Sequence, residues 1–377
     1  MEPPAPISPV TRRRFLGQLS VGAALALTQG RVRAFDTPEK KRLGVALVGL
    51  GSYSTRQLGP ALRSTEHCRL AGVVTGSREK GVRWARDYGF PESNIFDYDT
   101  MERISGNPDI DIVYVVTPNS LHATHCIAAA KAGKHVISEK PMATSLADCD
   151  AMISACRAAG VRLMIGYRLH YEPHHMEFAR LARERVFGPF MRISGANGFR
   201  MSSSATSKSV WRLNSKLAGG GPLMDMGVYV VQAACMAKVE AAPVAVTATF
   251  GPVTRPDVFS EVEESIEWTM EFADGALAKC RSTYGEQVSS FRAEADHGWA
   301  QFEDPAFYYA EPMLTTSRGS VDLPKVNQQA AQLDGMALEL LEGRPSLAPG
   351  EMGRRDIAIV EAIYAAARSG RRTKVDV

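Results

Sequence analysis

The chain has 377 residues, of which 45% are hydrophobic and 23% are charged. This length predicts two domains, and the composition is ordinary for a soluble globular protein and argues against extensive disorder. The formal net charge is +3 and shrinks without the arginine-rich N-terminus, so the chain lacks the basic surface expected of a nucleic-acid-binding protein.

The cysteines indicate neither a zinc site nor disulfide bonds. They show no CxxC spacing and no pairing with histidines, so we expect buried, free thiols. They are Cys68, Cys126, Cys149, Cys156, Cys235 and Cys280.

Residues 1–34 are predicted to be an export signal. Arg13-Arg14 stands directly before Phe15-Leu16, as in signals read by the twin-arginine export machinery. The apolar stretch 21–27 is far shorter than the ~20 residues that span a bilayer, so no stable membrane anchor is expected. Val32-Arg33-Ala34 is similar to a cleavage site. The sequence therefore predicts a periplasmic protein; an ordinary basic leader is the alternative.

The next predicted elements are a strand, a glycine turn, a helix and a second strand. Residues 43–50 are typical of a strand buried on both faces, and they lead into Gly49-Leu50-Gly51-Ser52-Tyr53-Ser54. Residues 57–62 have helical character and residues 69–74 form the next apolar run. This order is typical of a site where glycines let the backbone approach a pyrophosphate at a helix N-terminus. Ser54 replaces the third glycine, and a structural turn is the alternative.

The residues after the second strand indicate which dinucleotide binds. NAD sites normally carry an acid at this position, for the ribose hydroxyls. Here no acid occupies it, and the segment reads Thr75-Gly76-Ser77-Arg78-Glu79-Lys80. Its hydroxyls and cations suit a 2′-phosphate, so the sequence favours NADP over NAD. Solvated surface charges are the alternative for Arg78 and Lys80.

Three further strands are predicted at 112–116, 135–138 and 161–166. After the first, Thr117-Pro118 ends the strand, and Asn119 is predicted to cap a helix that carries His122 and His125. No third ligand with suitable spacing accompanies the histidines, so cap and cofactor contacts are favoured over a metal. The second strand leads into Glu139-Lys140-Pro141, which puts Lys140 at the strand end where such sheets bind ligands.

A helix predicted after Gly219-Gly220-Gly221-Pro222 carries Asp225 and Tyr229 four residues apart on one face. Oxidation of an alcohol needs a base for the hydroxyl proton while hydride leaves carbon. A phenol, with an ordinary pKa of about 10, needs a cation nearby to serve at neutral pH. Lys140 is the candidate, since it would also stabilise a developing alkoxide. A core tyrosine beside a helix-start acid is the alternative.

From about residue 190 the pattern changes to the two-residue period of strands. Apolar Ile266, Trp268, Met270 and Phe272 alternate with polar residues, and Asp274-Gly275 predicts a hairpin into residues 276–284. Residues 201–209 predict a loop, and residues 328–341 and 355–368 predict helices. A sheet with helices on one face leaves the other open, so we expect oligomerisation through it.

Short motifs follow one another in a fixed order along the chain. They are Val48-Gly49-Leu50-Gly51, Pro118-Asn119-Ser120-Leu121-His122-Ala123, Glu139-Lys140-Pro141-Met142-Ala143-Thr144-Ser145, Met164-Ile165-Gly166-Tyr167-Arg168, Trp211-Arg212-Leu213, and the run from Ala218 to Tyr229. With these motifs the chain resembles the Gfo/Idh/MocA oxidoreductases, and within that family the glucose-fructose oxidoreductase type.

This resemblance implies an α/β fold. A Rossmann dinucleotide-binding domain would cover residues 35–166, and a C-terminal α+β domain with an open-faced, mostly antiparallel sheet would cover residues 167–377. It implies an enzyme that oxidises one aldose to a lactone and reduces a second sugar with the NADPH that stays bound. Tyr229 would donate and accept the proton, Lys140 would polarise the sugar oxygen and Asp225 would orient the sugar. Tyr167 and His170 are further expected sugar contacts.

The motifs and the resemblance together predict the NADP contacts. They are Gly49, Leu50, Gly51, Ser52, Tyr53, Thr75, Ser77, Arg78, Lys80, Thr117, Pro118, Asn119, His122, Glu139, Lys140, Arg168, Trp211 and Arg212. The twin-arginine route carries folded proteins, so tightly bound NADP would travel inside the protein, and thiols would stay reduced during cytoplasmic folding. A dimer or a tetramer is expected.

Several alternatives remain open. The glucose-fructose type has a long proline-rich arm before its first strand, and here only residues 35–42 stand there. The alternatives are a related aldose-aldose oxidoreductase, a soluble sugar dehydrogenase, an NAD(P)-dependent glycoside hydrolase and a non-catalytic sensor, all of which share the family's fold. His170, His174 and His175 lie near the domain junction, where sugar hydrogen bonding or a surface cluster is favoured over a metal.

Overall fold

The structure, a computed structural model, describes residues 42–309 and 312–377. The predicted export signal lies outside these residues. Residues 35–41, which precede the first strand, also lie outside them. The chain from residue 42 onward folds as one compact unit, and none of its described helices is long and apolar enough to cross a membrane. All six cysteines lie in the described residues, where each is buried and unpaired.

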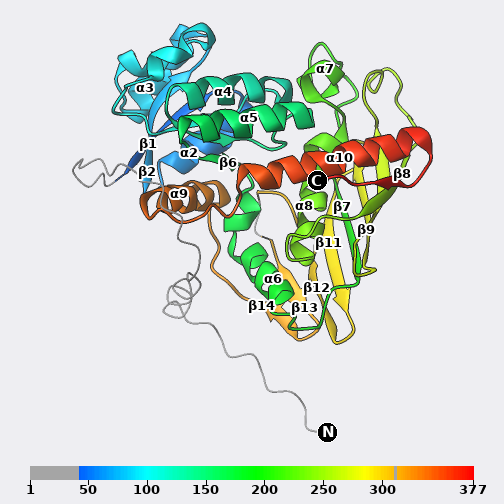
Figure 1. Cartoon of the computed structure of the whole chain (residues 1–377). Helices are drawn as coiled ribbons and strands as arrows, with labels where there is room; N and C mark the ends of the chain where they lie inside the picture. Colours follow the sequence, from blue (N-terminus) through cyan, green and yellow to red (C-terminus); the bar gives the residue numbers. More distant parts are fainter. Residues whose placement is uncertain (1–41, 310–311) are drawn as a thin grey trace. The chain divides into compact units, whose positions relative to one another are not determined.

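A six-stranded parallel sheet is built from the first part of the described chain (Figure 1). Its order is β3-β2-β1-β4-β5-β6, a doubly wound order that places ligands at the carboxyl ends of the strands. The strands are β1 (Leu43–Val48), β2 (Cys68–Val74), β3 (Ile95–Phe96), β4 (Ile112–Val115), β5 (His135–Ser138) and β6 (Leu163–Ile165). The helices are α2 (Gly59–Leu62), α3 (Arg78–Tyr88), α4 (His122–Lys131) and α5 (Leu146–Ala159).

The predicted strands of this sheet are confirmed to within two residues at each end. β1 and β4 are buried along their whole length. Strands of a parallel sheet are covered on both faces, which explains why their sequences are continuous apolar runs. The Rossmann fold that the resemblance implies is therefore present.

A second sheet of nine strands follows in the described chain, in the order β14-β13-β12-β11-β7-β10-β9-β8-β15. β7 and β10 pair in parallel, and the other neighbours are antiparallel. The strands are β7 (Arg192–Gly198), β8 (Ala245–Phe250), β9 (Ser265–Glu271), β10 (Leu277–Thr283), β11 (Val288–Ala295), β12 (Gly298–Phe302), β13 (Leu314–Thr316), β14 (Gly319–Val321) and β15 (Thr373–Lys374). The predicted hairpin is β9 and β10, and Gly275 in its turn has φ +85°, a left-handed value that favours glycine.

Helices cover one face of the nine-stranded sheet. The helices after β6 are α6 (Pro173–Arg183), α7 (Ser215–Ala218), α8 (Val228–Ala237), α9 (Gln328–Leu341) and α10 (Gly350–Ser369), and those on this sheet are α6, α8 and α10. α8 packs on β7, β10 and β11, and α10 packs on β8. Side chains of β9 and β10 accordingly alternate between buried and more exposed positions. The period-two pattern in the sequence reflects this one-sided covering.

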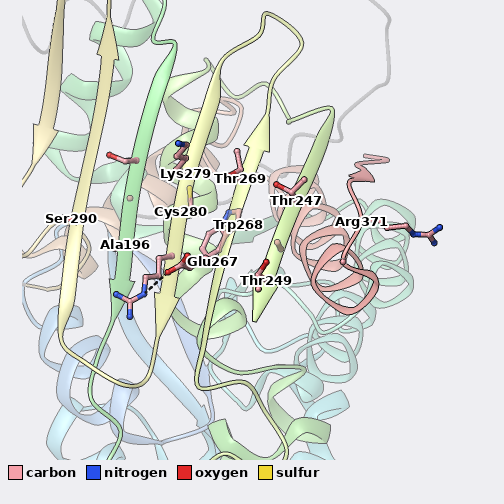
Figure 2. A pocket seen from close by; sticks show the side chains of 15 residues that line it. Ala196, Thr247, Thr249, Glu267, Trp268, Thr269, Lys279, Cys280, Ser290 and Arg371 are labelled. Atoms are coloured by element: carbon pink, nitrogen blue, oxygen red, sulfur yellow. Dashed lines mark ion pairs between the residues drawn. The ribbon is translucent and has the colours of Figure 1, made fainter. Parts of the chain in front are cut away.

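The other face of this sheet is open and polar. Figure 2 shows Thr247, Thr249, Thr269 and Lys279 along it, and Arg281 pairs with Glu267 there at 3.8 Å. An antiparallel sheet can expose such a face to water without a partner.

The C-terminal helices join the two sheets. The predicted helix 328–341 is confirmed as α9, and it packs on α2 and β2 of the parallel sheet. The predicted helix 355–368 lies within α10. The main-chain N–H of Ile165 donates to the oxygen of Ala348 at 2.8 Å, so the chain after α9 extends the contact.

Two helix starts differ from the prediction. The helix expected from residue 57 begins at Ser52 and contains a π-helical stretch, Ser54–Leu58, before α2. Asn119 makes no cap. Its side-chain amide instead donates at 2.8 Å to the carbonyl of Ala218, the last residue of α7. The last carbonyls of a helix lack partners within the helix. The Asn119 side chain therefore points toward the end of α7, where the Ala218 carbonyl accepts its hydrogen bond.

Candidate active site

Lys140, Asp225 and Tyr229 form one cluster beyond the end of β5. Lys140 Nζ donates to the main-chain oxygen of Asp225 at 2.7 Å and lies 3.5 Å from its Oδ1. The same nitrogen is 4.5 Å from the centre of the Tyr229 ring. The side chains of Lys140 and Asp225 are only 12% and 11% exposed, so water screens their charges weakly. The structure thus brings the three predicted catalytic residues together.

A π-helical stretch, Leu223–Gly227, carries Asp225 into this cluster. The sequence predicts an ordinary helix here, which is wrong for these residues. Such stretches interrupt the regular helical hydrogen-bond ladder, and side chains from other elements bond to the carbonyls. The Pro222 carbonyl accepts from Ser282 Oγ at 2.7 Å, and the Met226 carbonyl accepts from Asn197 Nδ2 at 3.0 Å. The Asp225 carbonyl accepts from Lys140 Nζ.

Glu263 anchors the start of the same helix. Its carboxylate accepts from the main-chain N–H groups of Gly221 and Leu223, at 3.0 and 3.2 Å, and from the Tyr364 hydroxyl at 2.8 Å. A negative charge is stabilised beside the free N–H groups of a helix N-terminus. Glu263 therefore fixes where Asp225 and Tyr229 enter the site.

Asp225 is surrounded by hydrogen-bond donors. Its Oδ2 accepts from Arg212 Nε at 2.9 Å and from the Tyr284 hydroxyl at 3.0 Å. Burial opposes its charge, but Arg212, Lys140 and the Tyr284 hydroxyl outweigh burial and hold the pKa of Asp225 below its ordinary value. Asp225 is a carboxylate at neutral pH, and its Oδ1 faces Lys140.

Tyr229 is buried, with 6% of its surface exposed. The guanidinium carbon of Arg168 lies 4.8 Å from the ring centre. Burial raises the pKa of Tyr229, and Arg168 opposes this rise more than any other charge does. The phenol is neutral at pH 7 and can donate a proton. To accept one, it depends on the positive charges around its ring.

Glu139 holds the main chain beside Lys140. Its carboxylate accepts from the Tyr114 hydroxyl at 2.6 Å and from the Lys140 N–H at 3.1 Å. Gln332 of α9 donates to the Tyr114 hydroxyl at 3.0 Å. Burial raises the pKa of Glu139, although these donors oppose the rise. Glu139 therefore positions the segment that carries Lys140.

The glycine turn after β1 leaves room for a phosphate. Gly49 has φ +93°, and a Cβ there would lie 3.1 Å from Thr117. A Cβ on Gly51 would meet no atom within 4 Å. The helix that begins at Ser52 has free N–H groups at this end, and Lys80 Nζ donates to the carbonyl of Leu50. Open space and free N–H donors fit the pyrophosphate of a dinucleotide.

The end of β2 offers hydroxyls, a cation and an aromatic ring. Ser77 Oγ caps α3 by accepting from the Lys80 N–H at 3.3 Å, whereas Arg78 is exposed and pairs with Glu92 at 3.3 Å. The Tyr98 ring lies 3.7 Å from the Cβ that Gly76 lacks. This surface fits the adenosine end of the cofactor, and the sequence does not predict the part played by Tyr98.

His122 connects the loop after β4 to the segment that carries Lys140. Its Nε2 lies 2.8 Å from the Thr117 carbonyl oxygen, and its Nδ1 lies 3.0 Å from that of Pro141. Burial lowers the pKa of His122 to about 4, so the ring is neutral at pH 7 and donates to one of the two oxygens. Thr117 Oγ1 is 3.1 Å from His125 Nδ1. The two histidines therefore order this loop.

Tyr167 and His170, the other predicted sugar contacts, do not join the cluster. Tyr167 is fully buried, and the charges that act on its hydroxyl most strongly are Asp356 and Arg355. The His170 ring lies 6.2 Å from the Tyr167 ring. The geometry gives a sugar-binding role for these two residues no support.

His174 and His175 are buried, so the prediction of a surface cluster is wrong. Their Nδ1 atoms donate to the two carboxylate oxygens of Glu172, at 2.9 and 2.7 Å. Glu172 caps the N-terminus of α6, and the histidines pack there because they satisfy this buried carboxylate. Within residues 42–309 and 312–377, no group of three His, Cys, Asp or Glu side chains could hold a metal ion.

Two tyrosines complete the cluster and are missed by sequence reasoning. Tyr284 follows β10, and Tyr309 belongs to a segment without regular structure. The Tyr309 ring centre lies 4.8 Å from the Arg168 guanidinium and 5.8 Å from the Tyr53 ring centre. No periodic pattern or motif marks either residue. Of the predicted cofactor pair Trp211 and Arg212, Arg212 binds Asp225 and lies 4.6 Å over the Trp211 ring.

Known proteins resemble the chain along most of its length. Residues 43–167 match a model described as an oxidoreductase family with an NAD-binding Rossmann fold, and residues 175–301 match the GFO/IDH/MocA C-terminal domain. The structure of an aldose-aldose oxidoreductase from Caulobacter crescentus, complexed with glycerol, is 41% identical with a TM-score of 0.84, over 89% of this chain and 100% of that chain.

Two more distant proteins are also similar to the chain along most of its length. The D-xylose 1-dehydrogenase [NADP(+)] of Haloarcula marismortui is 27% identical, over 88% of this chain and 92% of its own. A levoglucosan dehydrogenase, in complex with NADH and levoglucosan, has a TM-score of 0.76 at 21% identity, over 89% of this chain and 100% of that chain. At that identity the last comparison shows a common fold.

Proposed function

Since the chain belongs to the GFO/IDH/MocA family of oxidoreductases, we propose that it is an NADP-dependent sugar oxidoreductase. It oxidises an aldose to its lactone and reduces a second sugar with the NADPH that it retains, a reaction of the aldose-aldose or glucose-fructose type. The observation that carries the proposal is the buried cluster of Lys140, Asp225 and Tyr229 at the carboxyl end of the parallel sheet.

Each side chain of the cluster has its own role in the proton transfer. In its phenolate form, Tyr229 accepts the proton of the sugar hydroxyl while a hydride leaves the carbon that bears this hydroxyl. The nicotinamide, when bound, supplies the hydride chemistry. Lys140 donates to the sugar oxygen and stabilises its developing negative charge, and Asp225 balances Lys140 and Arg212 and orients the sugar through Oδ1. When the second sugar is reduced, Tyr229 gives the proton back.

The residues around the glycine turn would hold the cofactor. Gly49 and Gly51 leave space for the pyrophosphate, and Thr75, Ser77 and Lys80 would receive the 2′-phosphate. No acid occupies the position after β2 where NAD sites have one, which favours NADP.

The relatives support this reaction and one alternative. The aldose-aldose oxidoreductase supports a two-sugar reaction, because all of its chain aligns at 41% identity. The D-xylose dehydrogenase supports a soluble sugar dehydrogenase, which would exchange its cofactor in each turnover. Retention of the cofactor distinguishes the two.

The test begins with the purified exported protein. Its nucleotide is identified by mass spectrometry, and the absorbance of reduced nicotinamide is followed as aldoses and ketoses are added in turn. We expect bound NADP, its reduction by an aldose without added cofactor, and its reoxidation by a second sugar. Turnover only with added NADP⁺ indicates a dehydrogenase. Release of sugar from an aryl glycoside without net redox change indicates a glycoside hydrolase, and absence of any turnover indicates a sensor.

A single substitution tests the role of Tyr229. Tyr229→Phe should lower turnover by roughly a hundredfold to ten-thousandfold, the usual contribution of acid–base catalysis, while the bound nucleotide remains. Tyr308→Phe is the matched control, because the Tyr308 hydroxyl donates to the main-chain oxygen of Gly198. Full turnover in Tyr229→Phe would exclude the assigned role.

We also propose export to the periplasm by the twin-arginine machinery, which Arg13-Arg14 before Phe15-Leu16 supports. Replacing both arginines by lysine should leave the protein in the cytoplasm, as cell fractionation would show. Export of that variant would contradict the proposal.

Assembly as a dimer or tetramer through the open sheet face is proposed as well. A groove of about 600 Å³ on that face, with Thr247, Thr269 and Lys279 along it, supports a polar contact with a second copy (Figure 2). Light scattering after size-exclusion chromatography should give a multiple of the chain mass. Lys279→Glu should lower the measured mass toward that of a single chain. A wild type that is monomeric at all concentrations would refute the assembly.

A further inference from the structure

Arg168, at the start of the 3₁₀ turn Arg168–Tyr171, is a buried cation with no carboxylate partner in the described part of the chain. It is 1% exposed and forms no ion pair with any described residue. Its Nη2 donates to the main-chain oxygen of Phe307, and its Nε and Nη1 have no hydrogen-bond partner among the described atoms. The guanidinium carbon lies 4.8 Å from the ring centres of both Tyr229 and Tyr309.

Such a cation lowers the stability of a folded protein. A buried charge has lost its water, so it is normally paired, and buried N–H groups are normally hydrogen-bonded. Arg355, whose side chain is 11% exposed, has two carboxylate partners: it donates to Asp356 at 2.8 Å and to Glu240 at 2.7 Å, and only its Nη2 lacks a hydrogen-bond partner among the described atoms. An exception beside a reacting group points to a role in the reaction, because functional sites are where stability is given up.

We propose that Arg168 is a positioning residue that acts through Tyr229. Its guanidinium holds the ring in place, and its charge stabilises the phenolate that forms whenever Tyr229 is without its proton. A cation over an aromatic face is attracted to the ring electrons, and the attraction grows when the ring carries a negative charge. The inference rests on the proposed role of Tyr229 in proton transfer.

Other groups around Tyr229 do not replace Arg168. Those that act on Tyr229 or its immediate neighbours are Lys140, Arg212, Asp225, Glu139, Tyr53 and Tyr309. The carboxylates of Glu139 and Asp225 oppose the phenolate. Lys140 Nζ is hydrogen-bonded to Asp225, and Arg212 pairs with the same residue. Removing Arg168 therefore shifts the balance toward the neutral phenol.

The test places 3,5-difluorotyrosine at position 229, because its more acidic hydroxyl can be titrated by absorbance while the protein stays folded. We expect Arg168→Met to raise the titration midpoint by about one pH unit or more, the usual effect of removing an opposite charge at this distance. Arg168→Lys keeps a charge and should raise it less. Aldose oxidation should slow in Arg168→Met, and the fluorinated residue should restore part of the rate.

Thermal unfolding gives the second readout. Arg168→Met removes an uncompensated charge, so its melting temperature should equal or exceed that of the wild type. Arg355→Met is the matched control. It leaves Asp356 without its cation and with the hydrogen bond from Gln232 at 3.2 Å, so it should lower the melting temperature without moving the midpoint at position 229.

Two results would overturn the inference. One is an unchanged midpoint in Arg168→Met, and the other is a melting temperature as low as that of Arg355→Met, which would make Arg168 structural. If Arg168→Met does not fold, the midpoint in Arg168→Lys decides the question. The titration requires no turnover, so its outcome is separate from whether any sugar proves to be a substrate.

Discussion

Lys140 Nζ binds Asp225 at two places, donating to its main-chain oxygen at 2.7 Å and lying 3.5 Å from its carboxylate oxygen Oδ1. The main-chain oxygen is available because the π-helical stretch Leu223–Gly227 interrupts the helical ladder. The backbone thus sets the position of the lysine, and the carboxylate is left to balance the charges of Lys140 and Arg212.

Asp225→Asn removes the charge of the carboxylate while the main-chain bond that positions Lys140 remains. Asparagine keeps the main-chain bond to Lys140 and can still accept from Arg212 and Tyr284, but it no longer offsets two cations. We expect the free energy of unfolding to fall by about 2 kcal/mol and turnover to fall roughly a hundredfold. Urea unfolding and steady-state rates measure the two effects. Asp225→Ala should cost more, and wild-type activity in Asp225→Asn would show that the charge has no role.

Tyr284→Phe removes one of the two donors to Asp225 Oδ2. The pKa of Asp225 should then rise, because the Tyr284 hydroxyl helps to hold it down. The carboxylate becomes protonated at a higher pH, so the acid limb of kcat/KM should move to higher pH. Tyr308→Phe should leave this limb in place. Identical limbs in the wild type and both variants would rule out an effect of the Tyr284 hydroxyl on Asp225.

Lys80→Met tests the choice of cofactor. Lys80 is held at the glycine turn by its bond to the Leu50 carbonyl, whereas Arg78 is exposed and paired with Glu92. Loss of a charged contact to the 2′-phosphate should weaken NADP binding roughly tenfold or more and leave NAD binding nearly unchanged. Fluorescence titration of the nucleotide-free protein gives both dissociation constants. Arg78→Met is the comparison and should have the smaller effect, and equal weakening for NAD and NADP would contradict the assignment.

Acid stability should depend on Glu172. Burial opposes its charge, but hydrogen bonds from His174 and His175 outweigh burial and hold its pKa well below the ordinary value. A carboxyl with a depressed folded pKa contributes stability above its unfolded pKa and loses it as the pH falls. The free energy of unfolding of the wild type should therefore drop below about pH 4.5.

Glu172→Gln is the matched variant for this prediction. It should be less stable than the wild type at pH 7, and its free energy of unfolding should change less as the pH falls. Urea unfolding at a series of pH values measures both curves. Parallel curves would show that the Glu172 carboxylate does not cause the acid sensitivity.

The first sheet could be predicted closely because its strands are buried on both faces. β5, for example, has the predicted bounds His135–Ser138. The π-helical stretch at Asp225 could not, since the carbonyls in it and directly before it accept hydrogen bonds from Lys140, Asn197 and Ser282, which are distant in the sequence. Asn119 fails as a predicted cap for the same reason, because its partner is the Ala218 carbonyl.

Residue type and short spacing by themselves determined the parallel sheet, the glycine turn, the second sheet and the candidate trio Lys140, Asp225 and Tyr229. The sheets and the turn depend on interactions between residues near one another in the chain, or on the covering of whole faces, whereas the trio follows from side-chain chemistry and the family resemblance. Only the tertiary structure decided that Tyr284 and Arg212 bind Asp225, that Arg168 lacks a carboxylate partner among the described residues, and that Tyr167 lies apart from the cluster. Burial and charge balance arise from side chains that packing brings together, and no local pattern records them.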